Sequence, residues 1–172
     1  KTTTPVTRTV TVSGSNVCVS KFGFGLDFNA IRTMSANGFT IGYWKNNLDK
    51  AIAGKTSGTQ VSKATLTSYT NKIGDFALST YDSITMKTAA ATMGYNGSSS
   101  VSLLSKQLIA SEYNYQSGAY IGGNKTLTML FLWWGEYIVS NSSRYSSTSI
   151  LYAKDWFDAY NNTHGDLVAG PQ

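Results

Sequence analysis

Carboxylates are the side chains of this sequence best suited to acid–base chemistry, and Glu136 is the most unusual of them. It lies inside the apolar segment Leu127 to Ser140, directly after the residues Trp-Trp-Gly. A carboxylate buried there is costly unless a partner compensates its charge. We therefore expect a structural ion pair with a lysine, Lys45 being one candidate, in preference to an active-site acid.

A secreted hydrolase could draw on other acids of the chain. Asp155 and Asp158, in the segment Asp-Trp-Phe-Asp, fall on one face of an expected helix and could form a carboxylate pair for glycoside hydrolysis. Glu112 is a further candidate acid. The spacing of the two aspartates is also typical of the wet side of an amphipathic helix, and we favour that interpretation.

The remaining reactive residue types are single. His164, the sole histidine, precedes Gly165 at an expected helix end, where a capping or surface role is favoured. Cys18, the sole cysteine, is expected to be a small buried apolar residue. One histidine and one cysteine cannot build a structural zinc site, and the nine acids do not group as in a calcium loop. We predict no catalytic set, no cofactor and no metal.

Composition points to an extracellular protein. Only 13% of the 172 residues are charged, whereas serine and threonine make up about a quarter of the chain, so hydroxyls and amides must supply most of the polar surface. The net charge of +5 is spread along the chain without a cluster, which does not suggest a nucleic-acid site. A start at Lys1 fits a mature secreted chain, and the longest apolar run is too short to span a bilayer.

Four Asn-x-Ser/Thr sequons occur at or beside expected loops and helix ends. On a secreted chain such positions can carry N-linked glycans. We predict glycosylation at one or more of them: Asn96, Asn124, Asn141 and Asn161.

Hydrophobic periodicity predicts an α+β fold with N-terminal strands over about residues 5–45 and a four-helix region over about 60–162. Alternating valines and aromatics fill the first 30 residues, and from about Gln60 the apolar spacing becomes helical. The expected helices follow Gln60, begin at Ser99 or Ser100, cover Leu127 to Ser140, and lie within the last segment, Ser147 to Asn162. Residues 1–13 are expected as an extended strand or tail, and residues 14–172 as a single globular domain.

The stretch Gly-Tyr-Trp-Lys-Asn-Asn resembles the Gly-Tyr-Trp-Lys-Asn-His-Pro signature of a family of secreted and cell-surface domains in bacteria and archaea. The matching residues are Gly42, Tyr43, Trp44, Lys45 and Asn46, and Asn47 and Leu48 stand where the family usually has His and Pro. Leu103 to Asn114 and Ala153 to Gly165 resemble two further blocks of the family. The resemblance implies location and architecture, because the family has no established catalytic residues. We interpret the stretch as a structural plug between strands and helices; a sugar-stacking platform and a catalytic pocket are the alternatives.

These observations together predict a non-enzymatic extracellular subunit of a surface filament or layer, with copies of itself as partners. Strand donation is the expected means of polymerisation. The donated strand would carry Val6, Arg8, Val10 and Val12, although the following Ser-Gly-Ser-Asn could instead form a local hairpin. A secreted glycan-binding module and, less favoured, a secreted hydrolase are the alternative functions.

Overall fold

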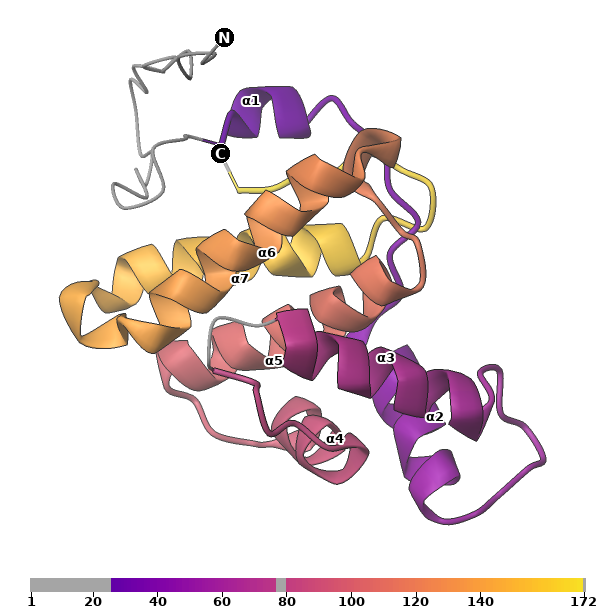
Figure 1. Cartoon of the computed structure of the whole chain (residues 1–172). Coiled ribbons are helices and arrows are strands. Elements are labelled where there is room, and N and C mark those ends of the chain that lie inside the picture. Colours follow the sequence, from indigo (N-terminus) through magenta and orange to yellow (C-terminus); the bar gives the residue numbers. More distant parts are fainter. Residues whose placement is uncertain (1–25, 77–79, 172) are drawn as a thin grey trace, which may run out of the picture.

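Helices form the regular structure of the chain wherever it is described, which is over residues 26–76 and 80–171 of the computed structural model (Figure 1). The α-helices are α1 (Phe28–Ile31), α2 (Ile41–Ile52), α3 (Lys63–Phe76), α4 (Met86–Gly94), α5 (Ser100–Gln116), α6 (Lys125–Ser140) and α7 (Ser147–Asn161). Two short 3-10 turns, η1 (Ile121–Gly123) and η2 (Ser142–Arg144), precede and follow α6.

The hydroxyls and amides that dominate the composition determine where these helices begin. In each of five helices the preceding side chain accepts a hydrogen bond from the backbone N–H three residues on, which satisfies one of the free donors of the first turn. These caps are Thr40, Thr85, Ser99, Asn124 and Ser146. Thr85 also forms a reciprocal capping box with Thr88.

Helix α5 is the centre of the arrangement. Every residue from Leu108 to Tyr115 is buried, so this helix is covered on all sides rather than along one stripe. Leu104 and Leu108 pack into a hydrophobic cluster with α1, α6 and α7, whereas Ile109 and Tyr113 pack into a second cluster with α2, α3 and α4. Figure 1 shows α5 between these two groups of helices.

Two glycines permit close approaches that hold the outer segments on this framework. A Cβ at Gly38 would lie 2.1 Å from the carbonyl oxygen of Tyr160, so the segment before α2 can rest on the end of α7 only with glycine there. A Cβ at Gly135 would lie 2.4 Å from the ring of Phe157, which brings α6 against α7. The segment at Ser35 also meets Leu167 in an isolated antiparallel bridge.

The structure contradicts the expected α+β class. Within the predicted strand region of residues 5–45, the described part holds α1 and the start of α2, and residues 5–25 lie outside the described residues. Thr40, within the predicted strand region, instead caps the start of α2. The described part of the region predicted to hold four helices contains five, because α4 was not expected as a separate helix. The helices expected after Ser99, over Leu127 to Ser140 and within the last segment are present as α5, α6 and α7.

Strand donation is also overturned. A donated strand needs a recipient sheet with an open edge, and the described residues form no strand or sheet beyond the isolated bridge at Ser35. The residues expected to form the donated strand lie outside the described part of the chain: Val6, Arg8, Val10 and Val12. The same holds for the whole of the predicted tail, residues 1–13.

Candidate functional site

Asn114 of α5 is the centre of a buried polar network. Its Oδ1 accepts hydrogen bonds from the backbone N–H of Phe39 at 2.8 Å and from the indole N–H of Trp44 at 2.9 Å. Its Nδ2 donates to the carbonyl oxygen of Phe39 at 2.9 Å and to Oδ1 of Asn161 at 2.8 Å. An asparagine side chain has two donor hydrogens and two acceptor lone pairs on the amide oxygen. Asn114, with none of its surface exposed, therefore uses its full capacity inside the protein.

Asn161 of α7 is saturated in the same way. Its Oδ1 accepts from Asn114 and from the hydroxyl of Ser111, and its Nδ2 donates to the carbonyl oxygen and to Oε1 of Gln107. Gln107 in turn donates from Nε2 to Oδ1 of Asp158 at 2.8 Å. We call Trp44, Gln107, Ser111, Asn114 and Asn161 the polar hub; it fastens α2 and α7 to α5.

Trp44 shows how the Gly-Tyr-Trp-Lys-Asn stretch is used. It lies in the first turns of α2, 1% exposed, with its ring stacked on Tyr113 at 5.4 Å between centroids. Tyr43 is half-buried and stacks on Phe39 at 4.3 Å. A buried indole offers no face to a sugar, so a glycan platform would have to use other rings.

The polar members of the stretch do not bond neighbouring helix ends. Lys45 forms an ion pair with Asp49 of its own helix at 2.6 Å, and its aliphatic stem lies against Gly94. Gly42 and Asn46 are exposed. These three positions therefore lie at the surface side of α2 while Trp44 faces the core.

Asn47, the first departure from the family signature, is a structural residue that sequence reasoning missed. It is fully buried, and its Oδ1 accepts the backbone N–H groups of Gln60 and Val61 at 2.8 and 3.1 Å. Its Nδ2 donates to the carbonyl oxygen of Tyr43. The asparagine thereby closes the loop that follows α2 back onto the helix.

The three sequence blocks that carry the resemblance meet in the polar hub. Trp44 comes from the first block, Gln107, Ser111 and Asn114 come from the second, and Asn161 comes from the third. The most distant of these residues are separated by more than one hundred positions in the chain. Their common property is mutual hydrogen bonding in the interior.

A pair of buried carboxyl groups lies on the other side of α5. Glu112 of α5 and Glu136 of α6 are the only glutamates of the sequence, and both have 0% exposure. Their carboxyl groups lie close enough to interact electrostatically, and neither oxygen of Glu112 has a hydrogen-bond partner among the described residues. Two ionised carboxylates buried side by side would repel each other, which favours the neutral, protonated form of one of them. Burial, followed by the negative charge of Glu136, raises the pKa of Glu112 well above its usual value of 4.5.

Tyrosines from two other elements surround this carboxyl pair. Burial, and then the charges of Glu136 and Glu112, raise the pKa of Tyr81, which lies before α4. Burial and the charge of Glu112 raise the pKa of Tyr160 on α7, whose hydroxyl donates to the carbonyl oxygen of Ala119. The expected pairing of Glu136 with Lys45 was wrong, because Lys45 pairs with Asp49 and the charged neighbour of Glu136 is the carboxyl group of Glu112, whose pKa is raised.

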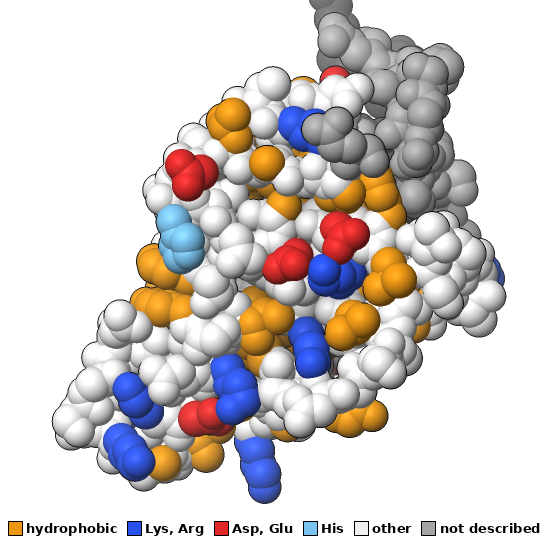
Figure 2. All heavy atoms as spheres, turned by 180° about the vertical axis from the view of Figure 1, so that it is seen from behind, with side chains coloured by type: hydrophobic (Ala, Val, Ile, Leu, Met, Phe, Trp, Pro, Cys, Tyr) orange, Lys and Arg blue, Asp and Glu red, His pale blue; other side chains and the backbone are white. Residues whose placement is uncertain are grey.

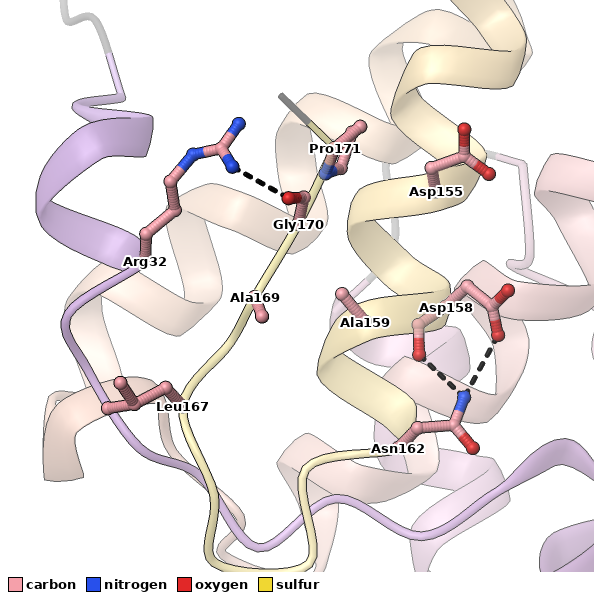
Figure 3. A pocket seen from close by; sticks show the side chains of 9 residues that line it. All are labelled: Arg32, Asp155, Asp158, Ala159, Asn162, Leu167, Ala169, Gly170 and Pro171. Carbon is pink, nitrogen blue, oxygen red and sulfur yellow. Dashed lines mark hydrogen bonds between the residues drawn. The ribbon is translucent and has the colours of Figure 1, made fainter.

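Asp155 and Asp158 line an open pocket of about 730 Å³ between α7, Arg32 and the C-terminal segment (Figure 3). Lys154 contacts both aspartates, at 2.7 and 3.1 Å. Burial lowers the pKa of Lys154, but its hydrogen bonds and charge interactions with the two aspartates raise it above its usual value overall. The aspartates thus form a partly exposed ion cluster, with side chains 47% and 39% exposed.

Arg32 forms the opposite wall of that pocket. Its guanidinium donates to the carbonyl oxygen of Gly170 at 2.7 Å and lies 4.9 Å from the ring centre of Trp156. The hydrogen bond ties the end of α1 to the C-terminal segment, as Figure 3 shows, and the contact with Trp156 ties it to α7. The charged side chains on both walls of the pocket therefore make stabilising contacts within the chain.

The four sequons differ sharply in their surroundings. Asn161 is buried and its Nδ2 is engaged, so a glycan, which is attached through that nitrogen, cannot be carried there in the folded chain. The Nδ2 of Asn141 donates to the carbonyl oxygen of Tyr137 at the end of α6. Asn124 is exposed and caps α6 through its Oδ1, and Asn96 is exposed in the loop between α4 and α5. The prediction for Asn161 is thus corrected, and Asn96 and Asn124 are the accessible sites.

The other two residues singled out for their reactivity are His164 and Cys18. His164 is exposed at a φ of 45° beyond α7, where its ring contacts Phe39, and Cys18 lies outside the described residues. Over the described ranges no three or more metal-binding side chains cluster, and none of the helices is both long and apolar enough to cross a membrane. Figure 2 shows one face of the molecule, on which uncharged polar side chains and backbone predominate over scattered charges.

Comparisons with protein-family models, with curated proteins and with solved structures found no match to this chain.

Proposed function

We propose that this chain is a non-enzymatic structural domain of an extracellular, cell-surface assembly. The observation that carries the proposal is the saturation of the polar hub. Both asparagines at its centre use all their hydrogen-bonding capacity on other parts of the chain, and both are fully buried. The residues that resemble a family of secreted domains are therefore engaged in holding helices together, which is the use that a structural domain makes of them.

The state of the candidate acids supports the same function. Glu112 and Glu136 have no exposed surface, whereas glycoside hydrolysis requires carboxyl groups that contact a sugar. Asp155 and Asp158 are exposed in part, but both form ion pairs with Lys154. None of these acids combines access to substrate with a free carboxylate.

Assembly with copies of itself remains part of the proposal, through side-chain surfaces instead of a donated strand. Three large apolar side chains lie exposed on different elements: Ile52 at 43%, Leu151 at 38% and Leu167 at 55%. Filaments or layers could form by such contacts if they do not close into a ring.

A glycan-binding module is the second candidate, and one observation favours it. Tyr95, at 58% exposure, is the only strongly exposed ring among the described Phe, Tyr and Trp side chains. Trp44, Trp134 and Trp156 are all buried. A single exposed ring offers only a small surface for stacking on a sugar, although aromatic residues make up 13% of the chain.

Immunogold electron microscopy of intact source cells, with antibodies raised against the 172-residue chain, tests the location and the assembly together. We expect gold on the outside of the cell, over filaments or a surface layer. Label confined to the cytoplasm would overturn the proposal.

The enzymatic alternative is tested on purified protein with a panel of polysaccharides. We expect no hydrolysis above background. Turnover that is lost in a folded Glu136→Gln variant but kept in a matched Asp49→Asn variant would show that the buried acid is catalytic. Asp49 is a suitable control because its side chain is exposed and forms an ion pair with Lys45 of the same helix, α2.

A further inference from the structure

The loop between α4 and α5 combines three features that occur together nowhere else among the described residues. It carries the accessible sequon Asn96-Gly97-Ser98, it contains the exposed ring of Tyr95, and it borders a pocket of about 350 Å³. Figure 1 shows where the chain passes from α4 to α5. The pocket is lined by residues of both helices and the loop: Ala91, Thr92, Tyr95, Val101, Ser102 and Ser105.

Asn96 is the sequon residue with the least structural use of its own side chain. Asn161 and Asn141 donate their Nδ2 groups to other residues, and Asn124 caps a helix. No hydrogen bond to the described residues holds the Asn96 side chain, and both it and Ser98 are exposed. A glycan at Asn96 would therefore displace no contact of the fold.

The ring of Tyr95 is held in place next to that asparagine. A Cβ at Gly97 would lie only 2.0 Å from Cε1 of Tyr95, so the ring lies directly against the glycine backbone. More than half of the tyrosine nevertheless remains exposed, so one part of its surface is open to a ligand. The ring and Val101 supply an apolar surface, and Thr92, Ser102 and Ser105 supply hydroxyls. This mixture of one aromatic surface and a few polar groups is typical of a small-molecule site.

We propose that Asn96 carries an N-linked glycan whose first sugars pack on Tyr95 and occupy this pocket. The proposal rests on the extracellular location proposed above. In the attachment step, Nδ2 of Asn96 forms a bond to C1 of a lipid-linked oligosaccharide, the bond from C1 to the lipid phosphate oxygen breaks, and the amide loses one proton; no oxidant or reductant is needed. An oligosaccharyltransferase of the secretory membrane supplies this reaction. Because the sugar is tethered one residue from the ring, its effective concentration at the pocket is high even if free sugar binds weakly.

The test uses the full chain produced in a host that attaches N-linked glycans. Glycopeptide mass spectrometry should find Asn96 occupied. Thermal unfolding should show a melting temperature at least about 2 °C higher for the glycosylated protein than for a Ser98→Ala variant, which lacks the sequon but keeps Tyr95. The matched control is Thr126→Ala, which removes the exposed sequon at Asn124, away from the pocket; its glycan loss should change the melting temperature by less than that.

A Tyr95→Ala variant decides whether the pocket receives the sugar. In this background the additional Ser98→Ala change should no longer lower the melting temperature. An undiminished effect would overturn the docking of the glycan, and an unmodified Asn96 beside a modified Asn124 would overturn the whole inference. Binding of free glycans in trans to the Ser98→Ala variant, lost on Tyr95→Ala, would instead identify the pocket as a glycan-binding site for other molecules and contradict the inference. Surface label with an unmodified Asn96 refutes this inference alone, whereas cytoplasmic label removes the proposed function as well.

Discussion

Replacing Glu112 by glutamine should change how the stability of the protein depends on pH. The folded protein holds a proton on the carboxyl pair to a higher pH than the unfolded chain does, since the pKa of Glu112 is raised well above 4.5 by burial and by Glu136. Below about pH 4.5 both states bind this proton, and the wild-type pair contributes its full stability. Above that pH the unfolded chain releases the proton while the folded protein retains it, so the free energy of unfolding falls by about 1.4 kcal/mol for each pH unit, until the folded pKa is passed.

The Glu112→Gln variant has nearly the same shape but cannot ionise at this position. We therefore expect the variant to gain on the wild type as pH rises from 4.5, by about 1.4 kcal/mol per unit. With a urea m-value of about 2 kcal/mol per molar, that corresponds to a relative midpoint shift of about 0.7 M per pH unit.

Urea unfolding followed by circular dichroism, from pH 4.5 to 9, measures this difference directly. Asp49→Asn is the control, because that exposed aspartate forms a surface pair and should produce only a small, nearly constant difference. If the difference between the wild type and the glutamine variant does not change with pH, Glu112 has the same proton affinity in both states, and the account of a protonated Glu112 in the folded protein is refuted.

Two further substitutions, each with a control, test the packing, and peptide mapping tests the burial of Asn161. Asn114→Ala should destabilise the protein by at least about 3 kcal/mol in urea unfolding, because it leaves several buried donors and acceptors without partners, whereas Asn46→Ala on the exposed side of α2 should change stability by less than about 0.5 kcal/mol. Gly135→Ala should cost about 1 to 3 kcal/mol through collision with an aromatic ring of α7, while Gly42→Ala, whose added Cβ meets nothing closer than 3.7 Å, should be neutral or slightly stabilising. Peptide mapping of native protein should find Asn161 unmodified; a glycan there on the folded chain would contradict its buried position.

Local sequence signals were sufficient for the helices of the second half. Ser99 and Ser146 are hydroxyl residues placed directly before apolar periodic segments, and this combination specifies a helix start without reference to the rest of the chain. The same cue was present at Thr40, which caps α2, but it was not used. The strand region was instead extended to residue 45 from the alternating valines and aromatics of the first 30 residues.

The polar hub could not be read from local patterns. Asn114 and Asn161 are 47 positions apart, and only the packing of α5 against α7 brings them together. At Asn161 the local pattern even indicated a different role, because Asn-Asn-Thr is a sequon whatever the surroundings of the asparagine are. A single sequence contains no signal that distinguishes a buried asparagine from an accessible one at such a position.

The carboxyl pair shows a similar limit. The rule that a buried acid needs compensation correctly drew attention to Glu136, but it suggested a lysine as the partner. A neutral, protonated Glu112 beside Glu136 removes one of the two buried charges without a basic partner. Composition contained one indirect hint that the glutamates differ from the other acids, since the chain has seven aspartates but only two glutamates. In the structure both glutamates are buried.

The central claim is that the Gly-Tyr-Trp-Lys-Asn stretch and its two companion blocks form a structural framework, and hydrogen exchange at the indole N–H of Trp44 tests it most directly. This proton is donated to Asn114 inside the hub at 2.9 Å, and the ring is 1% exposed. If the hub is part of the cooperative core, the indole proton should exchange only when the whole protein unfolds, with the same free energy as the backbone amide of Ile109 in α5, as measured by nuclear magnetic resonance. An indole proton that exchanges far faster than that amide would mean that the hub opens on its own, and it would contradict the structural role on which the proposed function depends.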